Sequence, residues 1–142
     1  ISAFSRAKKV RYLDNPLYFY RKNNESSITS TYRPNLVPQW DTLHDYISNY
    51  VNDDLERKER FSNRIACSII GLSLNEVSSK ASLLRKIKKL RSILKLNKYS
   101  SAINRTDLKY FSKHWLIIFA FARYKLATLL TLTFLFIHKV IL

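Results

Sequence analysis

Glycine, proline, methionine and cysteine are scarce in this chain of 142 residues, which has one glycine, three prolines, one cysteine and no methionine. So little glycine and proline excludes low-complexity linkers and argues against a turn-rich all-β fold, so helix is expected for most of the chain. The single cysteine, Cys67, excludes an internal disulfide and favours a reducing compartment. Because the chain begins at Ile1 and contains no methionine, we expect it to be a piece of a longer protein.

Acidic residues are nearly absent from the second half of the sequence. Residues 1–76 contain 11 Lys/Arg and 9 Asp/Glu, whereas residues 77–142 contain 14 Lys/Arg and one carboxylate, Asp107. The net charge of +15 therefore divides into +2 and +13. A basic and apolar half predicts an anionic partner surface, either phospholipid headgroups or nucleic acid. Residues 1–9 are polar and basic, and they lack the apolar region of a signal peptide.

Two runs near the N-terminus have the composition of β-strands. Residues 10–13 and 17–22 are rich in aromatic and aliphatic side chains, and Asp14, Asn15 and Pro16 between them suit a turn. Two short strands are not stable alone, because their edges stay unpaired and their aromatic faces uncovered. They therefore need a sheet that this chain does not encode.

From Pro34 onward the spacing of apolar residues predicts only helices. The lone glycine, Gly71, is expected to loosen or end the second of them. The expected helices cover residues 37–52, residues 56–72, a basic segment with Ser79 as its N-cap, a segment with Thr106 as its N-cap, and the apolar residues that end the chain.

The sequence contains no convincing cluster of catalytic or metal-binding side chains. Asp53 and Asp54 are adjacent, so on a helix their side chains point about 100° apart, and we expect an exposed helix end rather than a metal pair. Cys67 lies among apolar residues and predicts a buried structural thiol. Packing or interface roles are expected for the scattered histidines His44, His114 and His138.

The C-terminal segment is apolar but interrupted by charge. Residues 126–137 form an apolar-or-threonine run of 12, and residues 115–122 form one of eight. A membrane-spanning helix needs about 20 apolar residues, so neither run qualifies by itself. Basic helices beside apolar, aromatic helices predict a surface that lies among the headgroups of an anionic leaflet, with core packing and a true span as alternatives. The expected membrane-surface residues are Lys86, Lys89, Trp115, Arg123 and Lys125.

The stretch VRYLDNPLYFYRKNNESSIT contains several elements in a fixed order. This order resembles the segment that ends the catalytic GT-A domain of bacterial family 2 glycosyltransferases. The resemblance covers about the first 30 residues; beyond them only the type matches, a basic helical extension apposed to a membrane. The matching elements are Ala7-Lys8-Lys9, the strand 10–13, Asp14, Pro16-Leu17-Tyr18, Phe19, Tyr20-Arg21, the loop 22–26 and Ser27-Ile28.

The resemblance implies that the arginine and the hydroxyls after it lie beside the diphosphate of a nucleotide sugar. A guanidinium offers paired donors to phosphate oxygens, and hydroxyls and backbone N–H groups can complete the anion site. The expected donor-binding residues are Arg21 and Ser27, with Ser26 and Thr29 behind them. The Asp-x-Asp motif that holds a divalent metal, Mg or Mn, in this family has no counterpart in the chain, and the catalytic carboxylate is also absent.

Taken together, these patterns predict an α+β fragment: residues 1–32 end a GT-A domain with its last two strands, and residues 33–142 form a mainly helical, basic extension. The implied function is transfer of a sugar from a nucleotide sugar to a surface-glycan or lipid-linked acceptor at the cytoplasmic face of a bacterial membrane. This piece alone should be inactive. The alternative is a basic helical module without catalysis, which binds nucleic acid through Lys80–Lys98 or serves as a membrane-surface adaptor; nucleic acid is the less expected partner.

Overall fold

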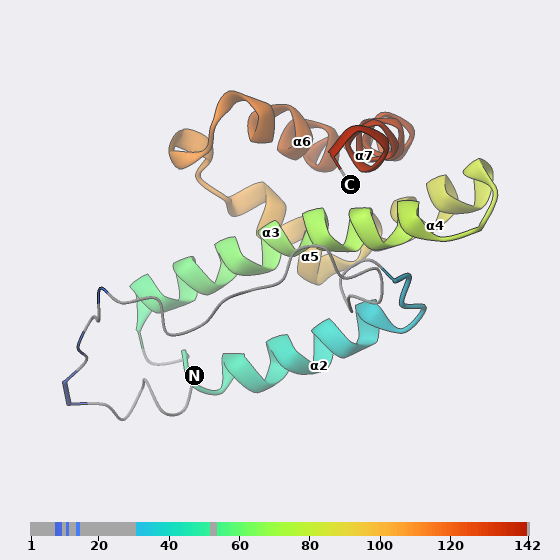
Figure 1. Cartoon of the computed structure of the whole chain (residues 1–142). Coiled ribbons are helices and arrows are strands. Elements are labelled where there is room, and N and C mark those ends of the chain that lie inside the picture. The colour runs from blue at the N-terminus through green and yellow to red at the C-terminus, as the bar shows by residue number, and fades with distance from the viewer. Residues whose placement is uncertain (1–7, 10, 12–13, 15–30, 52–53, 142) are drawn as a thin grey trace.

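The computed structural model describes residues 8, 9, 11, 14, 31–51 and 54–141. Helices dominate this part of the chain (Figure 1). They are α2 (Leu36–Ser48), α3 (Leu55–Ser78), α4 (Leu83–Lys95), α5 (Asn97–Arg105), the 3-10 turn η1 (Leu108–Tyr110), α6 (Lys113–Arg123) and α7 (Ala127–Ile141).

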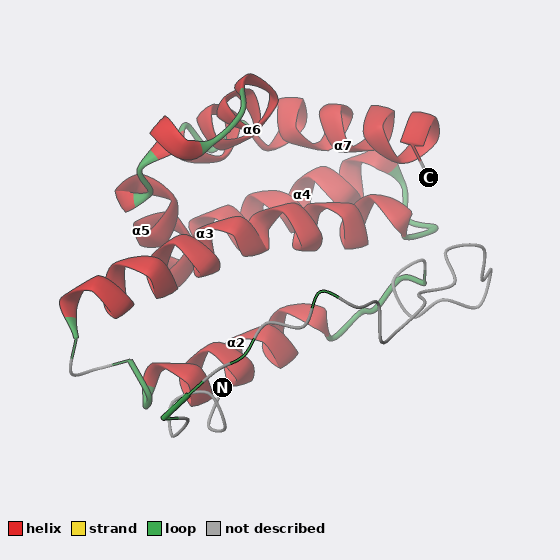
Figure 2. Cartoon of the chain, turned by 60° about the vertical axis from the view of Figure 1, so that its left-hand side comes forward, coloured by secondary structure: helices red, strands yellow, loops and turns green. Residues whose placement is uncertain are grey.

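The helices form three layers with α3 at the centre. Figure 2 shows α3, α4 and α5 in the middle, with α6 and α7 on one side and α2 on the other. The longest helix, α3, packs on α2, α4, α5 and α7, while α6 packs on α5 and α7. Tyr99, Phe119 and Phe134 are the largest fully buried side chains, and they come from α5, α6 and α7. The core is therefore built where the middle layer meets the α6–α7 layer.

The predicted α+β fold is wrong for the described residues, which contain helices and no strand. The two expected strands, 10–13 and 17–22, lie outside the described residues except for Arg11. The physical reason for the correction is that the amphipathic helices cover one another. Their apolar faces form a single cluster of buried side chains, and no sheet is needed to bury them.

The segment before α2 is fixed to the middle of the bundle by an amide. The Arg33 backbone N–H donates to Asn75 Oδ1 at 2.8 Å, and Asn75 Nδ2 donates to the Arg33 carbonyl at 3.0 Å. Asn75 lies on α3, so this pair of bonds ties the chain entering α2 to the central helix. The domain boundary expected at residue 33 stays a prediction.

The start of α3 follows the prediction, and its end does not. Asp54 accepts hydrogen bonds from the backbone N–H groups of Glu56 at 2.9 Å and Arg57 at 3.3 Å, so it caps an exposed helix end as expected. The helix then runs through Gly71 to Ser78. Gly71 does not end it, because its φ is not positive; the missing side chain instead makes room for Trp40 of α2.

Two hydroxyls expected to begin helices are found at helix ends. Ser79 Oγ donates to the Glu76 carbonyl at 2.7 Å, at the C-terminus of α3, and Ser82 precedes α4. Thr106 Oγ1 donates to the Ala102 carbonyl at 2.8 Å, at the C-terminus of α5. Both N-cap predictions are therefore wrong, since a hydroxyl that bonds back to a carbonyl three or four residues earlier serves the preceding helix.

Candidate functional site: an apolar outer face and a basic helix

Exposed apolar side chains gather on the layer formed by α6 and α7. Of the 14 large hydrophobic side chains exposed in the described part of the chain, eight come from this layer. Exposed apolar side chains gathered on one layer of a bundle favour a contact site for a partner or a membrane. We call these residues the α6–α7 outer face: Trp115, Ile117, Tyr124, Leu126, Leu129, Leu132, Phe136 and Val140.

Helix α7 supplies half of this face because it is apolar on both sides. Ala127, Leu130, Thr131 and Phe134 are buried against the bundle. The opposite side carries Leu129, Leu132, Phe136 and Val140, at spacings of three, four and four, which places them in one row. Phe136 and Val140 are 68% and 63% exposed. A helix that is apolar all round normally has both sides covered, and here one side faces solvent.

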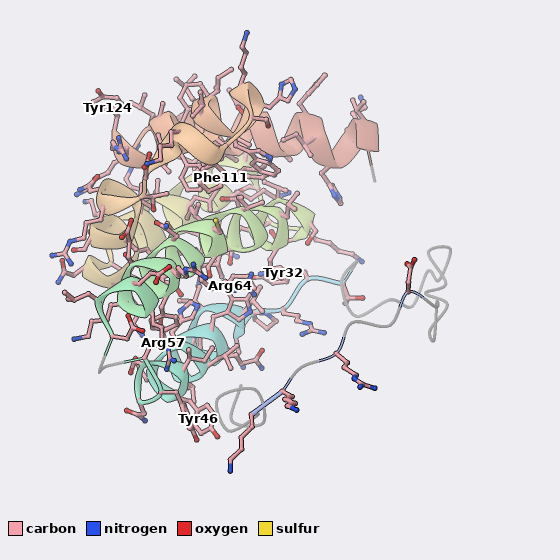
Figure 3. The ribbon with its side chains drawn as sticks, turned by 90° about the vertical axis from the view of Figure 1, so that its left-hand side faces the viewer. Tyr32, Tyr46, Arg57, Arg64, Phe111 and Tyr124 are labelled. Atoms are coloured by element: carbon pink, nitrogen blue, oxygen red, sulfur yellow. The ribbon has the colours of Figure 1, made fainter. Side chains whose placement is uncertain are left out.

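The turn between α6 and α7 has a defined hydrogen-bond pattern, which sets the angle between the two helices. Lys125 N–H donates to the Ala122 carbonyl at 3.1 Å, and Leu126 N–H donates to the Phe121 carbonyl at 2.8 Å, which is the Schellman pattern. Lys125 takes the left-handed position with φ 56°, where glycine is usual. Tyr124, 74% exposed, points away from the bundle at this turn (Figure 3).

Exposed basic side chains lie at the start of α6, at the turn and near the end of α7, and we call them the basic rim. Lys113 and His114 begin α6, Lys125 occupies the turn, and Lys139 is near the end of α7; all four are exposed. No Asp or Glu follows Asp107 in the sequence. The α6–α7 layer therefore carries an apolar face and a basic rim.

The five predicted membrane-surface residues separate into two groups. Trp115 (37% exposed) and Lys125 lie on or beside the α6–α7 outer face, and Lys89 is exposed on α4. Lys86 and Arg123 are only half-exposed and bond internally, which sequence spacing did not reveal. Lys86 Nζ donates to the Val77 carbonyl at 2.7 Å, near the end of α3.

Arg123 serves the end of α5. Its Nη2 donates to the carbonyls of Ile103 at 3.1 Å, Asn104 at 3.4 Å and Thr106 at 3.2 Å. These carbonyls belong to the last turn of α5 and its cap, where a cation is also favoured by the helix dipole. Its bonds mark Arg123 as a positioning residue that joins α6 to α5.

A second charged surface lies on α4. The exposed side of this helix carries five cations and no carboxylate. The opposite side, which includes Leu90, Ile93 and Leu94, is buried. We call the exposed set the α4 basic arc: Arg85, Lys88, Lys89, Arg91 and Lys95.

A buried polar cluster between α2, α3 and α5 was not anticipated from the sequence. His44 is 3% exposed, and its ring meets those of Trp40, Phe61 and Tyr99 at 6.0–6.3 Å. His44 Nε2 lies 3.3 Å from Ser68 Oγ, while its Nδ1 is buried without a hydrogen bond in the described part of the chain. Burial, followed by repulsion from Lys98, lowers the pKa of His44.

The residues around this histidine form an electrostatic link between α2 and α5. Tyr99 OH donates to Asp41 Oδ1 at 3.1 Å, and Lys98 Nζ bonds Asp45 Oδ1 at 2.8 Å. Burial and the nearby Asp41 carboxylate raise the pKa of Tyr99. Ser68 Oγ also donates to the Arg64 carbonyl at 3.1 Å, so it is held as a helical serine. The ring contacts of His44 with Trp40, Phe61 and Tyr99 are packing contacts, the role expected for this histidine.

The described residues do not fit a metal site, since they contain no group of three or more His, Cys, Asp or Glu side chains placed to hold an ion. Cys67 is half-buried and free, and burial raises the pKa of its thiol. The predicted donor-diphosphate residues Arg21, Ser26, Ser27 and Thr29 lie outside the described residues.

Among the described helices, none combines the length and the apolarity required to cross a bilayer. A scan of protein-family models, a search of curated proteins and a search of solved structures found no match to this chain.

Proposed function

We propose that residues 31–141 form a helical module that docks on an anionic membrane surface through the α6–α7 outer face. The observation that carries this proposal is the coincidence of exposed apolar side chains with a rim of exposed cations on one layer of the bundle. An apolar centre is attracted to the acyl boundary, and lysines at its edge are attracted to anionic headgroups.

A bilayer suits this face better than a second copy of the chain. Two copies meeting through the α6–α7 outer face would bring basic rims together, and each chain carries a net charge of +15. The repulsion between them is not offset by any carboxylate on the face, because none follows Asp107. An anionic leaflet turns the same charges into attraction.

The apolar and electrostatic contributions have similar magnitudes. Burying a fully exposed Leu, Val or Phe side chain is worth about 1.5–3 kcal/mol, so each partly exposed residue contributes about 1–2 kcal/mol. Each lysine near an anionic leaflet adds about 1 kcal/mol. Because both are needed to offset the cost of association, binding should depend on apolar contact and on anionic lipid.

Co-sedimentation with vesicles tests the proposal. The full chain should bind vesicles of equal phosphatidylcholine and phosphatidylglycerol, and bind phosphatidylcholine alone much more weakly. Phe136→Ser/Val140→Ser should weaken binding to the anionic vesicles about 30-fold or more, since about 2–4 kcal/mol of apolar contact is lost.

The matched control changes two exposed leucines elsewhere. Leu55→Ser/Leu84→Ser alters side chains that are 85% and 72% exposed on α3 and α4, and it should leave vesicle binding unchanged. Equal losses from both double variants would mean that the α6–α7 outer face has no special part in docking, and the proposal would fail.

The ordered elements at residues 7–28 support a second proposal, that the protein containing this chain is a glycosyltransferase acting on a surface glycan. Its donor would be a nucleotide sugar, and Arg21 with Ser27 would bind the diphosphate. The helical module would then hold the enzyme beside a lipid-linked acceptor. In the intact enzyme, Arg21→Ala should raise KM for the nucleotide sugar about 10- to 100-fold, the value of a charge-assisted hydrogen bond. An unchanged KM would remove Arg21 from the donor site.

A further inference from the structure

The α4 basic arc is a dense and uncompensated group of charges. Its five cations fall within residues 85–95, a rise of about 15 Å along the helix. In the described part of the chain none of them makes a salt bridge. Lys89 interacts with one carboxylate, that of the buried Glu76. Burial raises the pKa of Glu76, and the charge of Lys89 lowers it by a smaller amount.

This arrangement costs α4 stability on its own. Arg85 and Lys88, Lys88 and Arg91, and Arg91 and Lys95 are three or four residues apart, so like charges are neighbours on the helix surface. Each such pair destabilises a helix by about 0.2–0.5 kcal/mol. An anion that binds from outside would relieve this repulsion.

The shape of the arc distinguishes a groove from a flat surface. At 3.6 residues per turn the five cations spread over about 160° of the helix circumference, with Arg91 toward one edge and Lys89 toward the other. A plane can touch only the crest of such a convex surface. A groove with anionic walls contacts the crest and both flanks, so it can pair with all five side chains at once.

We propose that α4 lies in the major groove of duplex DNA and that the α4 basic arc contacts phosphates on both walls. The major groove is about 12 Å wide and admits an α-helix, whereas the major groove of duplex RNA is too deep and narrow for side chains to read. The arc contains only Arg and Lys side chains, which pair with phosphates and can also reach guanine edges, and it has no Asn or Gln for adenine. Binding is therefore dominated by phosphate contacts, which carry no sequence information.

This surface is separate from the α6–α7 outer face. Helix α4 packs on α3, α5 and α7, and the exposed basic arc is opposite the side that makes these contacts. Helix α7 likewise exposes the side turned away from α3 and α4. A flat bilayer against α7 thus leaves the α4 basic arc free, and the inference does not depend on the proposed membrane docking.

Fluorescence anisotropy with a random-sequence DNA duplex of about 20 base pairs tests the inference, with the full chain titrated at several salt concentrations. Five phosphate contacts predict that log K falls with log salt with a slope of about −4.5, at about −0.9 per contact. Arg85→Ala/Lys88→Ala/Lys95→Ala should bring the slope to about −1.8. Since these three residues are exposed and alanine favours helix, the melting temperature of the triple variant should not fall below that of the parent chain.

The matched control removes three cations from the other surface. Lys113→Ala/Lys125→Ala/Lys139→Ala makes the same change in net charge and should leave the slope within about half a unit of that of the parent chain. Equal slopes for the two triple variants would show that net charge alone attracts DNA, and would overturn the proposal. It would also be overturned if the α4 variant lost anionic-vesicle binding but kept its DNA affinity, because the arc would then be a lipid contact.

Discussion

Replacing Arg123 by alanine should destabilise the fold and leave membrane docking intact. The guanidinium lies between α6 and α5, and its Nη2 reaches three carbonyls at the end of α5 at 3.1–3.4 Å. Arg123→Ala removes these donors together with the cation that opposes the negative end of the helix dipole. The carbonyls of Ile103 and Thr106 are held beside a half-buried side chain, so water replaces the lost bonds only in part.

The magnitude follows from these bonds. Hydrogen bonds to a charged group contribute about 1.5–3 kcal/mol, and a cation at a helix C-terminus adds about 0.3–1 kcal/mol. The Nε of Arg123 is buried without a partner in the described part of the chain, which reduces the net value of the side chain. We therefore expect Arg123→Ala to lower the free energy of unfolding by about 2 kcal/mol, or the melting temperature by about 6–10 °C.

Urea denaturation followed by circular dichroism measures this loss. Arg123→Lys keeps the charge but not the planar fork of donors, so it should recover about half of the stability. Lys125→Ala is the matched control: it removes an exposed cation two residues away and should cost less than about 0.5 kcal/mol. A stable Arg123→Ala that binds anionic vesicles poorly would refute the reasoning, since Arg123 would then be a membrane contact as the sequence first indicated.

Three further predictions concern single positions. Gly71→Ala should destabilise by about 1–3 kcal/mol in urea denaturation, because its Cβ would lie 2.7 Å from the Trp40 ring; an unchanged midpoint would mean that the ring shifts freely. Burial lowers the pKa of His44, so the unfolded chain binds the extra proton and stability should decrease as pH falls below about 6.5. His44→Phe should remove this pH dependence; the raised pKa of Glu76 acts in the opposite direction in both proteins and cancels in the comparison. Lys125→Gly should raise the melting temperature, as relief of a left-handed residue is worth about 1 kcal/mol, and a decrease would contradict the Schellman assignment.

For α2 and α3, the sequence predicted the first residue of the helix better than the last. The starts of α2 and α3 lie within one residue of expectation, because apolar periodicity is a local signal. The role of Gly71 was missed because it depends on Trp40, 31 positions away in the sequence. Ser79 and Thr106 were assigned to the wrong helix because a hydroxyl can serve either neighbour, and the choice is made by packing.

The candidate surfaces show the same limit. That Lys86 and Arg123 bond inward was invisible in sequence, because a long basic side chain beside apolar residues can equally reach solvent or a buried carbonyl. The spacing of the charges in the sequence already indicates the α4 basic arc. Its separation from the α6–α7 outer face becomes clear only from the structure, in which α4 packs on α7.

Helix α7 gives the strongest reason to expect a partner surface outside the described chain. It carries apolar side chains on both its buried and its exposed sides. The inner side is covered by α3 and α4, which explains why Leu130 and Phe134 are buried. The outer row has no such cover, and leaving Phe136 and Val140 in water forfeits about 1–2 kcal/mol each. In the proposed docking, the uncovered row of α7 would lie flat at the membrane boundary, with Lys139 among the headgroups.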